Sequence, residues 1–511
     1  MKKYIYLLSI ATLGLASCSK DYLETSPESS EATETIVGST DNVALSINGI
    51  ARAMTQQYLG TQGMNGEGTI ISWYGDFTGN DTQKCNQTGW ATLWNSNYNL
   101  RANSIYDYYP WFYYYKLISN ANGVICNIDN ATGTEGEKAY YKAQALVFRA
   151  YSFFRLSELY SYRWKDTQGE TPGIVVRLDQ SIGDYPLSTL KETYEQIYKD
   201  LDEAISLFQK SGKSRASSDF YLPGLDVAYA VYAKAALTRE DWANAAKYAQ
   251  LARQGHSLMS PAQYKSGFNS ANDDWIWGVY EASDQTLYYY SVYAYIASNA
   301  SSSNCRTYPL AISKELIDQI PATDVRRDLF LVPSDEEWAE CNAAGRSQGI
   351  LYRRAFAENG DRLYSTSLVY AYMHFKFLAE FMPGGGSFPI IRSAEMYYTE
   401  AEADCHLGQD AQAQQLLYDV TSIYDPSYAK STKTGNDLLT EVKLYRRFDL
   451  WGEGHDWFDY KRWGEARVRK TKAQGGSWHT SYAGTFAPTD GNNWTWAIPE
   501  RETDYNSALS E

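Results

Sequence analysis

The chain has 511 residues, a formal net charge of −15 at neutral pH and 44% hydrophobic residues. An acidic chain is not expected to bind nucleic acid or anionic lipid headgroups, because both ligands require clustered Lys and Arg. Its length allows a large buried core.

The first eighteen residues have the pattern of a bacterial lipoprotein export signal. Two lysines near the start are followed by an apolar stretch at 4–13, and Cys18 stands directly after small residues. The apolar stretch is shorter than the roughly 20 residues that cross a bilayer, so it predicts a signal peptide at 1–17 and no transmembrane helix. Acyl chains such as palmitate are expected on Cys18, where they anchor the mature protein to the membrane.

A tether is predicted between this lipid anchor and the folded part. Residues 18–40 are rich in Ser, Thr and Glu and contain few large apolar residues, which is typical of a flexible segment. No linker of Pro, Gly and Ser and no run of charges interrupts the chain after this point. We therefore expect a single body at 41–511.

Apolar residues recur at helical spacing through much of this body. Helices are predicted at 41–50, 111–125, 138–160 and 194–208. The segments 229–252 and 396–418 each have the pattern of a helix, a tight turn and a second helix, with alanines where the helices approach closely. This pattern is typical of tetratricopeptide-type pairs, so the predicted fold class is mainly α, a scaffold of helical pairs with long irregular loops.

Three stretches lack this periodicity. Residues 60–89, 257–308 and 471–496 are rich in Gly and polar residues, and loops are predicted there. Binding residues concentrate on loops that a rigid scaffold holds in place, so these stretches are where function is expected.

Five cysteines remain after Cys18 is assigned to the lipid, namely Cys85, Cys126, Cys305, Cys341 and Cys405. They contain no C-x-x-C pair, so they indicate neither a zinc site nor dithiol chemistry. Cys126 and Cys405 lie in apolar helical patterns and are expected to be buried and inert. Disulfide pairing among the others stays open.

Several motifs, in one order along the chain, resemble those of the RagB/SusD-like nutrient-binding lipoproteins of the Bacteroidota outer membrane. They are Lys20-Asp21-Tyr22-Leu23 after the lipidated cysteine, the stripe of Trp111, Tyr115, Ile118 and Asn122, the segments 194–205, 241–246 and 391–397, the block 446–463, and Ile498-Pro499-Glu500 with Asn506. The block 446–463, RRFDLWGEGHDWFDYKRW, is the most specific of them. Asp449 and Asp456 depart from the usual pattern, which more often has Glu and Arg there.

The resemblance implies a tetratricopeptide-like scaffold that presents loops to an oligosaccharide ligand. It divides the body into an N-terminal part at about 41–212 and a C-terminal part at about 260–511. It also implies that the protein lies in the outer membrane, faces the cell exterior and caps a TonB-dependent (SusC-like) transporter. Catalysis does not belong to that role, so we expect no enzyme activity. We assign no cofactor and no metal ligands, and whether calcium is bound stays open.

Aromatic residues in the polar loops are the candidates for ligand contact. A sugar ring needs a flat aromatic ring under its C–H face and hydrogen-bonding groups beside it. The candidate ligand-binding residues are Trp73, Tyr74, Asp76, Asn80, Asp81, Trp90, Trp94, Tyr288, Tyr289 and Tyr290. Trp90 and Trp94 are equally well explained as side chains that pack their loop onto the scaffold.

Two alternatives stay open. Some members of the family bind peptides through the same scaffold, and a secreted glycoside hydrolase would need a carboxylate pair such as Asp76 and Asp81. The acids around His455 in the block 446–463 indicate structure instead, because two glycines interrupt the helical pattern and no metal-binding motif is present. Stacking and salt bridges at a helical junction are expected there.

Overall fold

The computed structural model describes residues 38–61, 63–87, 101–283, 291–488 and 494–509. The predicted signal peptide, Cys18 and nearly all of the predicted tether lie outside these ranges. None of the helices within them has the length and apolar content needed to span a lipid bilayer.

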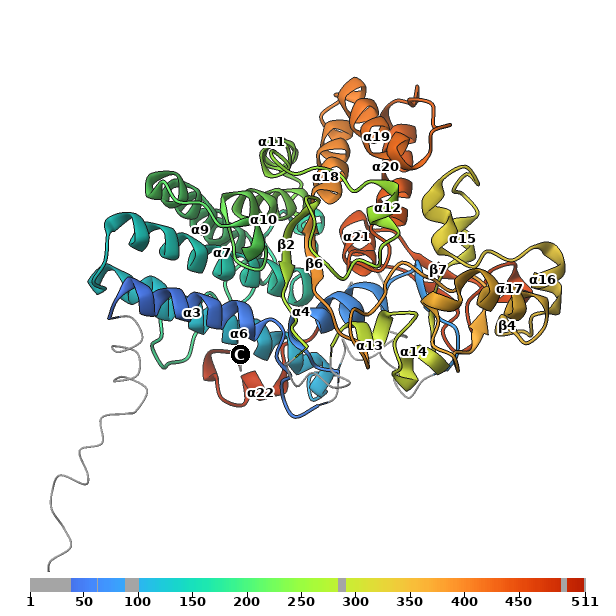
Figure 1. The fold of residues 1–511 in the computed structure, drawn as a ribbon. Helices are drawn as coiled ribbons and strands as arrows, with labels where there is room; N and C mark the ends of the chain where they lie inside the picture. Colours follow the sequence, from blue (N-terminus) through green and yellow to red (C-terminus); the bar gives the residue numbers. More distant parts are fainter. Residues whose placement is uncertain (1–37, 62, 88–100, 284–290, 489–493, 510–511) are drawn as a thin grey trace, which may run out of the picture.

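The described part is mainly α-helical, which confirms the predicted fold class (Figure 1). The long helices are α3 (Thr40–Ala53), α6 (Ile105–Asn127), α7 (Glu135–Tyr160), α9 (Leu190–Ser211), α10 (Leu225–Thr238), α11 (Trp242–Ala252), α17 (Ile350–Asn359), α18 (Ser393–His406), α19 (Asp410–Tyr424), α20 (Gly435–Asp449) and α21 (Asp456–Trp463). Shorter helices are α4 (Gly66–Thr69), the π-helix η2 (Ile70–Asp76), α8 (Trp164–Thr167), α12 (Pro261–Tyr264), α13 (Tyr293–Ile296), α14 (Ser303–Thr307), α15 (Lys314–Ile317), α16 (Asp335–Glu340) and α22 (Glu500–Thr503). Single 3-10 turns are η3 (Ile128–Asn130), η4 (Ser217–Asp219), η5 (Val325–Leu329), η6 (Gly360–Arg362), η7 (Lys472–Gln474) and η8 (Ser507–Leu509).

The sequence determines the ends of several long helices. At the start of α9 the Thr189 side chain accepts from the Glu192 backbone N–H, and the Glu192 carboxylate accepts from the Thr189 backbone N–H, which is a capping box. The helix ends at Gly212, whose φ of 63° favours glycine. A capping box of Thr134 and Glu137 starts α7 in the same way.

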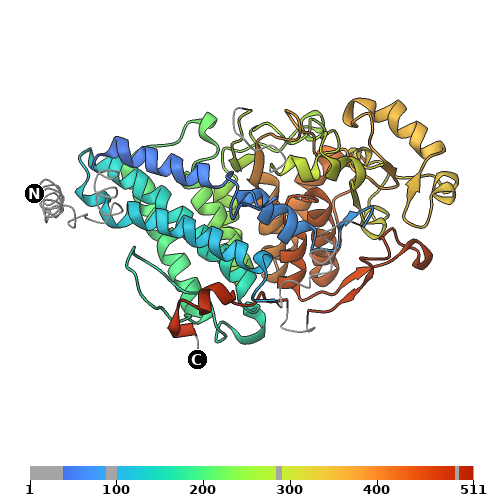
Figure 2. The same cartoon turned by 90° about the horizontal axis from the view of Figure 1, so that it is seen from below.

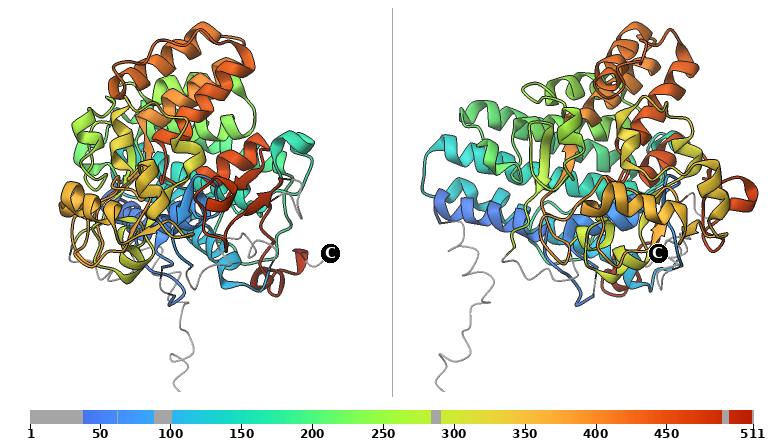
Figure 3. Two further views of the ribbon diagram at one scale, coloured as in Figure 1. Left: turned by 90° about the vertical axis from the view of Figure 1, so that its right-hand side faces the viewer. Right: turned by 45° about the vertical axis from the view of Figure 1, so that its right-hand side comes forward.

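The helices pack side by side in a stack of two groups, which are joined where α11 packs on α18. In the first group, α3, α6, α7 and α9 lie side by side, and α10 with α11 continues the stack (Figures 1 and 2). In the second group, α18 packs on α19 and α20, and these helices stand together in both views of Figure 3. The helix–turn–helix units predicted at 229–252 and 396–418 are thereby confirmed as the pairs α10–α11 and α18–α19. Buried alanines of α10 and α11 let these two helices approach closely.

The strands form short antiparallel pairs between the helices. They are β1 (Thr82–Lys84) with β3 (Leu310–Ile312), β2 (Trp275–Val279) with β6 (Phe388–Arg392), β4 (Arg346–Ser347) with β5 (Val369–Tyr370), and β7 (Arg467–Arg469) with β8 (Gly484–Phe486). The pair β2–β6 lies near the centre of the molecule, directly before α18 (Figure 1).

A buried network of charges joins β6 to the block 446–463. Arg392 donates to Asp274 at 2.6 Å, to Asp449 at 3.0 Å and to Glu453 at 2.6 Å. Lys376 donates to Glu453 at 2.6 Å. The side chains of all five residues are at most 4% exposed. The prediction of salt bridges at a helical junction is therefore confirmed for this block.

The predicted loop at 60–89 is wrong for residues 66–76. These residues form α4 followed by η2, and all of them are buried. Their polar groups find partners on the neighbouring helices: the Glu67 carboxylate accepts from the hydroxyls of Tyr151 at 2.7 Å and Tyr114 at 3.0 Å. These partners come from distant parts of the chain, so the local sequence alone has the polar pattern of a loop.

All five cysteines of the described residues carry free thiols. Cys85, Cys305 and Cys341 are buried, and Cys405 is half-buried. The prediction of a buried Cys126 is wrong, since this residue lies exposed in the last turn of α6 with its Sγ 3.7 Å from the carbonyl oxygen of Leu178.

Candidate ligand-binding site

Trp73 and Tyr74 lie in the core and have no exposed surface. Trp73 packs edge-to-face on Tyr295, with ring centroids 5.6 Å apart, and a Cβ at Gly63 would lie 2.3 Å from its indole. Tyr74 packs on Trp496 and donates its hydroxyl to the carbonyl oxygen of Tyr106 at 2.5 Å. Trp73 and Tyr74, predicted as ligand contacts, are therefore not open to a ligand in this conformation, because the π-helix η2 turns both rings inward.

The predicted polar candidates Asp76 and Asp81 bind the C-terminal block. The Asp81 carboxylate accepts two hydrogen bonds from Arg447, at 2.7 and 2.6 Å. The Asp76 carboxylate accepts from the backbone N–H of Gly454 at 3.0 Å. Burial, and then the charge of Asp456, raise the pKa of Asp76 well above its usual value. Each of the two aspartates is 2% exposed, so in this conformation they do not flank a glycosidic bond.

Asn80 and Asp456 form the centre of the same contact. The backbone N–H groups of Asn80 and Asp81 donate to the Asp456 carboxylate at 2.8 and 2.5 Å, and the Asn80 side chain donates to the Tyr460 hydroxyl at 3.1 Å. Burial, and then the Asp81 charge, raise the pKa of Asp456 to about 7. Asp456 therefore holds a backbone turn by accepting its N–H groups. An arginine at this position could not do so, because its side chain has no hydrogen-bond acceptor.

The remaining candidates, Trp90, Trp94, Tyr288, Tyr289 and Tyr290, lie outside the described residues. Their contact with ligand stays a prediction.

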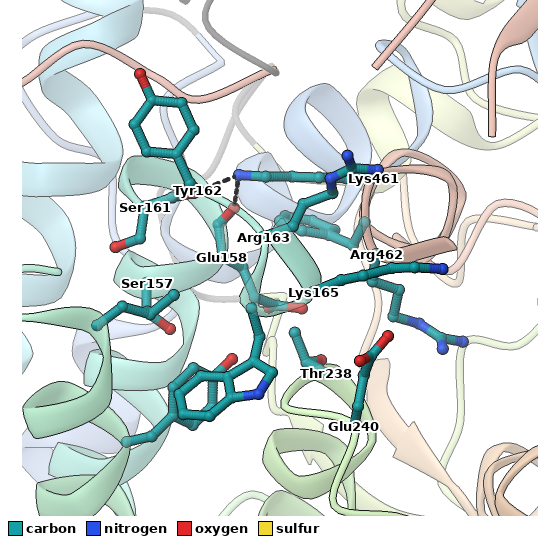
Figure 4. A pocket seen from close by; sticks show the side chains of 14 residues that line it. Ser157, Glu158, Ser161, Tyr162, Arg163, Lys165, Thr238, Glu240, Lys461 and Arg462 are labelled. Atoms are coloured by element: carbon teal, nitrogen blue, oxygen red, sulfur yellow. Dashed lines mark hydrogen bonds between the residues drawn. The ribbon is translucent and has the colours of Figure 1, made fainter. Parts of the chain in front are cut away.

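A hollow lined by residues of α7, α8, α9 and α21 is shown in Figure 4, and its free space is too small for a sugar. Its free volume is about 30 Å³, which is room for roughly two water molecules. Lys461 crosses it and donates to the carbonyl oxygens of Glu158 at 2.6 Å and Ser161 at 2.9 Å (Figure 4). These two hydrogen bonds join α21 to the C-terminal end of α7, and burial lowers the pKa of Lys461 to about 7.

An accessible aromatic surface lies where the loop before α10 meets the end of β2. We call Phe220, Tyr221 and Tyr280 the Tyr280 platform. The Tyr280 ring lies 5.7 Å from that of Tyr221 and 6.3 Å from that of Phe220, and Tyr280 is 49% exposed. Neither tyrosine hydroxyl takes part in a hydrogen bond among the described residues.

Backbone contacts hold the platform in place. The Trp277 indole N–H donates to the carbonyl oxygen of Tyr221 at 3.1 Å, and the Gly278 N–H donates to that of Phe220 at 3.1 Å. Burial, and then the nearby Asp219 carboxylate, raise the pKa of Tyr221. An exposed ring pair beside a carboxylate has the chemistry of a sugar site.

Trp73 was selected as an aromatic residue in a polar segment, and Phe220 and Tyr221 share this feature, since both follow Asp219. Tyr280 follows the apolar strand β2 and so has the appearance of a core residue. Only the fold brings Tyr280 next to Tyr221.

Comparison with known proteins identifies the family. The sequence profile described as the SusD family matches residues 244–511, which is more than half of the chain. This chain belongs to the SusD family. A second profile, described as "starch-binding associating with outer membrane", matches residues 21–237. No curated protein matches the chain.

Solved structures of SusD-like proteins share the fold. A SusD-like carbohydrate-binding protein from Bacteroides vulgatus is 22% identical and has a TM-score of 0.74, over 92% of this chain and 97% of that one. A SusD superfamily protein from Bacteroides thetaiotaomicron is 21% identical with a TM-score of 0.71, over 92% and 99%. Surface glycan-binding protein A from the same species is 15% identical with a TM-score of 0.66, over 93% and 98%. The helical pairs described above are thus the SusD-like fold.

Proposed function

We propose that this chain is a cell-surface lipoprotein that binds oligosaccharides and delivers them to a TonB-dependent (SusC-like) transporter of the outer membrane. The observation that carries the proposal is an exposed aromatic platform beside a carboxylate in a member of the SusD family. Tyr280 and Tyr221 offer flat rings to the C–H face of a sugar, and Asp219 offers an acceptor to its hydroxyls. The description of the N-terminal profile supports both the ligand class and the location.

Binding without turnover is part of the proposal. The carboxylates of the hydrolase alternative, Asp76 and Asp81, are buried against Gly454 and Arg447. Release of shortened products from a labelled oligosaccharide would favour the hydrolase, and retention of peptides in place of glycans would favour the peptide-binding alternative.

Tyr280→Ala should weaken retention by a neutral polysaccharide about tenfold, which corresponds to roughly 1.4 kcal/mol. Loss of one ring that contacts a sugar accounts for a change of this size. The measurement is migration of the purified chain through native gels that contain soluble starch or one of a panel of other neutral polysaccharides.

Tyr505→Ala is the matched control, because Tyr505 is 86% exposed and contacts no other ring of the described residues. This variant should migrate as the unaltered chain does. Equal retention of the Tyr280 and Tyr505 variants would remove the platform from the binding site.

Cys18→Ala should release the chain from the outer-membrane fraction, since the lipid is the proposed anchor and no described helix spans a bilayer. A TonB-dependent transporter should co-purify with the lipidated chain from detergent-solubilised outer membranes. The proposed partner is refuted if such membranes yield the lipidated chain alone.

A further inference from the structure

A second hollow lies beside β4 and the start of α17, at the end of the molecule opposite α3 (Figure 1). β4 pairs with β5 so that Arg346 faces Tyr370 and Ser347 faces Val369, and α17 begins at Ile350. The hollow between these elements has a volume of about 270 Å³. This is near the lower end of the roughly 300–1,000 Å³ of small-molecule sites, so it suits one unit of a longer ligand.

An exposed aromatic ring forms one wall of this hollow. Tyr352, in the first turn of α17, is 37% exposed and lines the space. Its ring rests on that of Phe356, with centroids 5.0 Å apart and an angle of 48° between the planes. The ring is therefore held by its neighbour one turn along the helix, while part of it stays accessible.

Polar groups without protein partners line the same space. The Ser367 hydroxyl is buried, in a residue only 4% exposed, and has no hydrogen-bond partner among the described residues. Buried hydroxyls are nearly always paired, so the Ser367 hydroxyl has a hydrogen bond to give to a water molecule or to a ligand that enters the hollow. The amide of Gln348 also lines the hollow, and no described residue takes up its hydrogen-bonding capacity.

Arg346 gives the hollow its charge. Among the described residues, no hydrogen bond or ion pair uses its guanidinium. Arg354, on the same helix as Tyr352, instead forms a paired contact with Glu337 at 2.7 and 2.9 Å. The Glu340 carboxylate accepts from the hydroxyl of Ser347, which lines the hollow, and from the backbone N–H groups of Ile350 and Leu351, each at 3.0 Å, and it forms no ion pair with Arg346. The Arg346 charge is therefore free to act on a ligand.

We propose that this hollow is a second saccharide site, separate from the Tyr280 platform, that holds a sugar unit bearing a carboxylate or a sulfate. Tyr352 lies under the sugar ring, Arg346 binds the acidic group through paired N–H donors, and Ser367 with Gln348 binds ring hydroxyls. A guanidinium matches the planar carboxylate and the sulfate oxygens better than it matches neutral hydroxyls. This proposal rests on the proposed function, because it takes the ligand to be a glycan. The site would let the chain bind anionic sugar units, which its net negative charge otherwise repels.

The test is titration of the detergent-solubilised full-length chain with three polymers at 150 mM salt: polygalacturonate, dextran sulfate and dextran. Polygalacturonate carries carboxylates and dextran sulfate carries sulfates, whereas dextran is neutral and serves as the reference. The unaltered chain should bind at least one anionic polymer, and which of the two binds more tightly assigns the acidic group. Arg346→Gln should weaken that binding at least tenfold. Tyr352→Ala should weaken it severalfold.

Arg353→Gln is the matched control, since it removes the same charge from an exposed position on α17 that does not line the hollow. It should leave the affinity within about twofold, and all three variants should keep the melting temperature because the altered side chains are exposed or half-buried. Equal losses for the Arg346 and Arg353 variants would overturn the proposal, because general charge then explains binding.

The outcomes separate this site from the proposed function. If neutral polysaccharide is retained through Tyr280 while neither anionic polymer binds, the second site is refuted and the glycan-binding function stands. If no polysaccharide of either kind binds, both proposals fail. Anionic binding that Tyr280→Ala abolishes and Arg346→Gln leaves unchanged assigns the acidic sugar to the Tyr280 platform instead.

Discussion

Arg392→Met should lower the free energy of unfolding by about 3–5 kcal/mol, because it leaves buried carboxylates without their main cation. Arg392 contacts Asp274, Asp449 and Glu453, and its own side chain is 1% exposed. Burial alone raises the pKa of Asp449, but the charges of Arg392 and Arg326 outweigh it and hold that pKa below its usual value. Unfolding in urea measures the loss.

The deficit of this variant should shrink as the pH falls. Burial raises the pKa of Asp274 in the folded chain even beside Arg392, and removal of that guanidinium raises the Asp274 pKa further. The folded variant then holds more protons than the unfolded one, so its stability falls as the pH rises. A smaller deficit at pH 5 than at pH 7.5 is expected.

Lys265→Met provides the comparison, since Lys265 pairs with Asp328 at 2.7 Å where the Asp328 side chain is 65% exposed. A surface pair of this kind contributes about 0–1 kcal/mol. If both variants unfold at the same urea concentration, the buried network contributes no more than a surface contact.

Trp73→Ala should destabilise the chain by about 3–5 kcal/mol, the usual loss when a fully buried aromatic side chain is removed. The indole has no exposed surface and packs on Tyr295 and Tyr106. Denaturant unfolding of the purified variant measures the change.

The exposed Tyr505 again supplies the control, because Tyr505→Ala is expected to alter stability by no more than about 0.5 kcal/mol. A Trp73 variant that unfolds like the unaltered chain but no longer retains glycan would return this indole to the ligand site.

The helical pairs were predictable because their signal is local. Apolar residues at a period of 3.6 specify the buried face of α10–α11 and α18–α19 regardless of what covers that face. The block 446–463 was also interpretable, since a cluster of Arg, acidic and Trp residues between glycines indicates a junction of salt bridges.

The candidate site was only partly predictable, for two physical reasons. Residues 66–76 are buried on all sides, so they carry no amphipathic stripe, and the tyrosines that satisfy Glu67 come from α6 and α7. The Tyr280 platform arises from a contact between Tyr221 and Tyr280, which no local pattern encodes. Aromatic residues in polar segments were the correct residue type, but exposure depends on tertiary packing.

The contact between Asp81 and Arg447 also constrains the order in which the chain can fold. The two residues are 366 positions apart, and Asp456, which holds the turn at Asn80, is further still. At a synthesis rate of roughly 5–20 residues per second, Arg447 is made about 20–70 s after Asp81. The turn at Asn80 can therefore form its contacts with Asp456 only after 376 further residues have been made, whereas α6 and α7 are complete much earlier. The helices near the N-terminus can thus pack early, whereas the contact of Asn80 and Asp81 with Arg447 and Asp456 forms late.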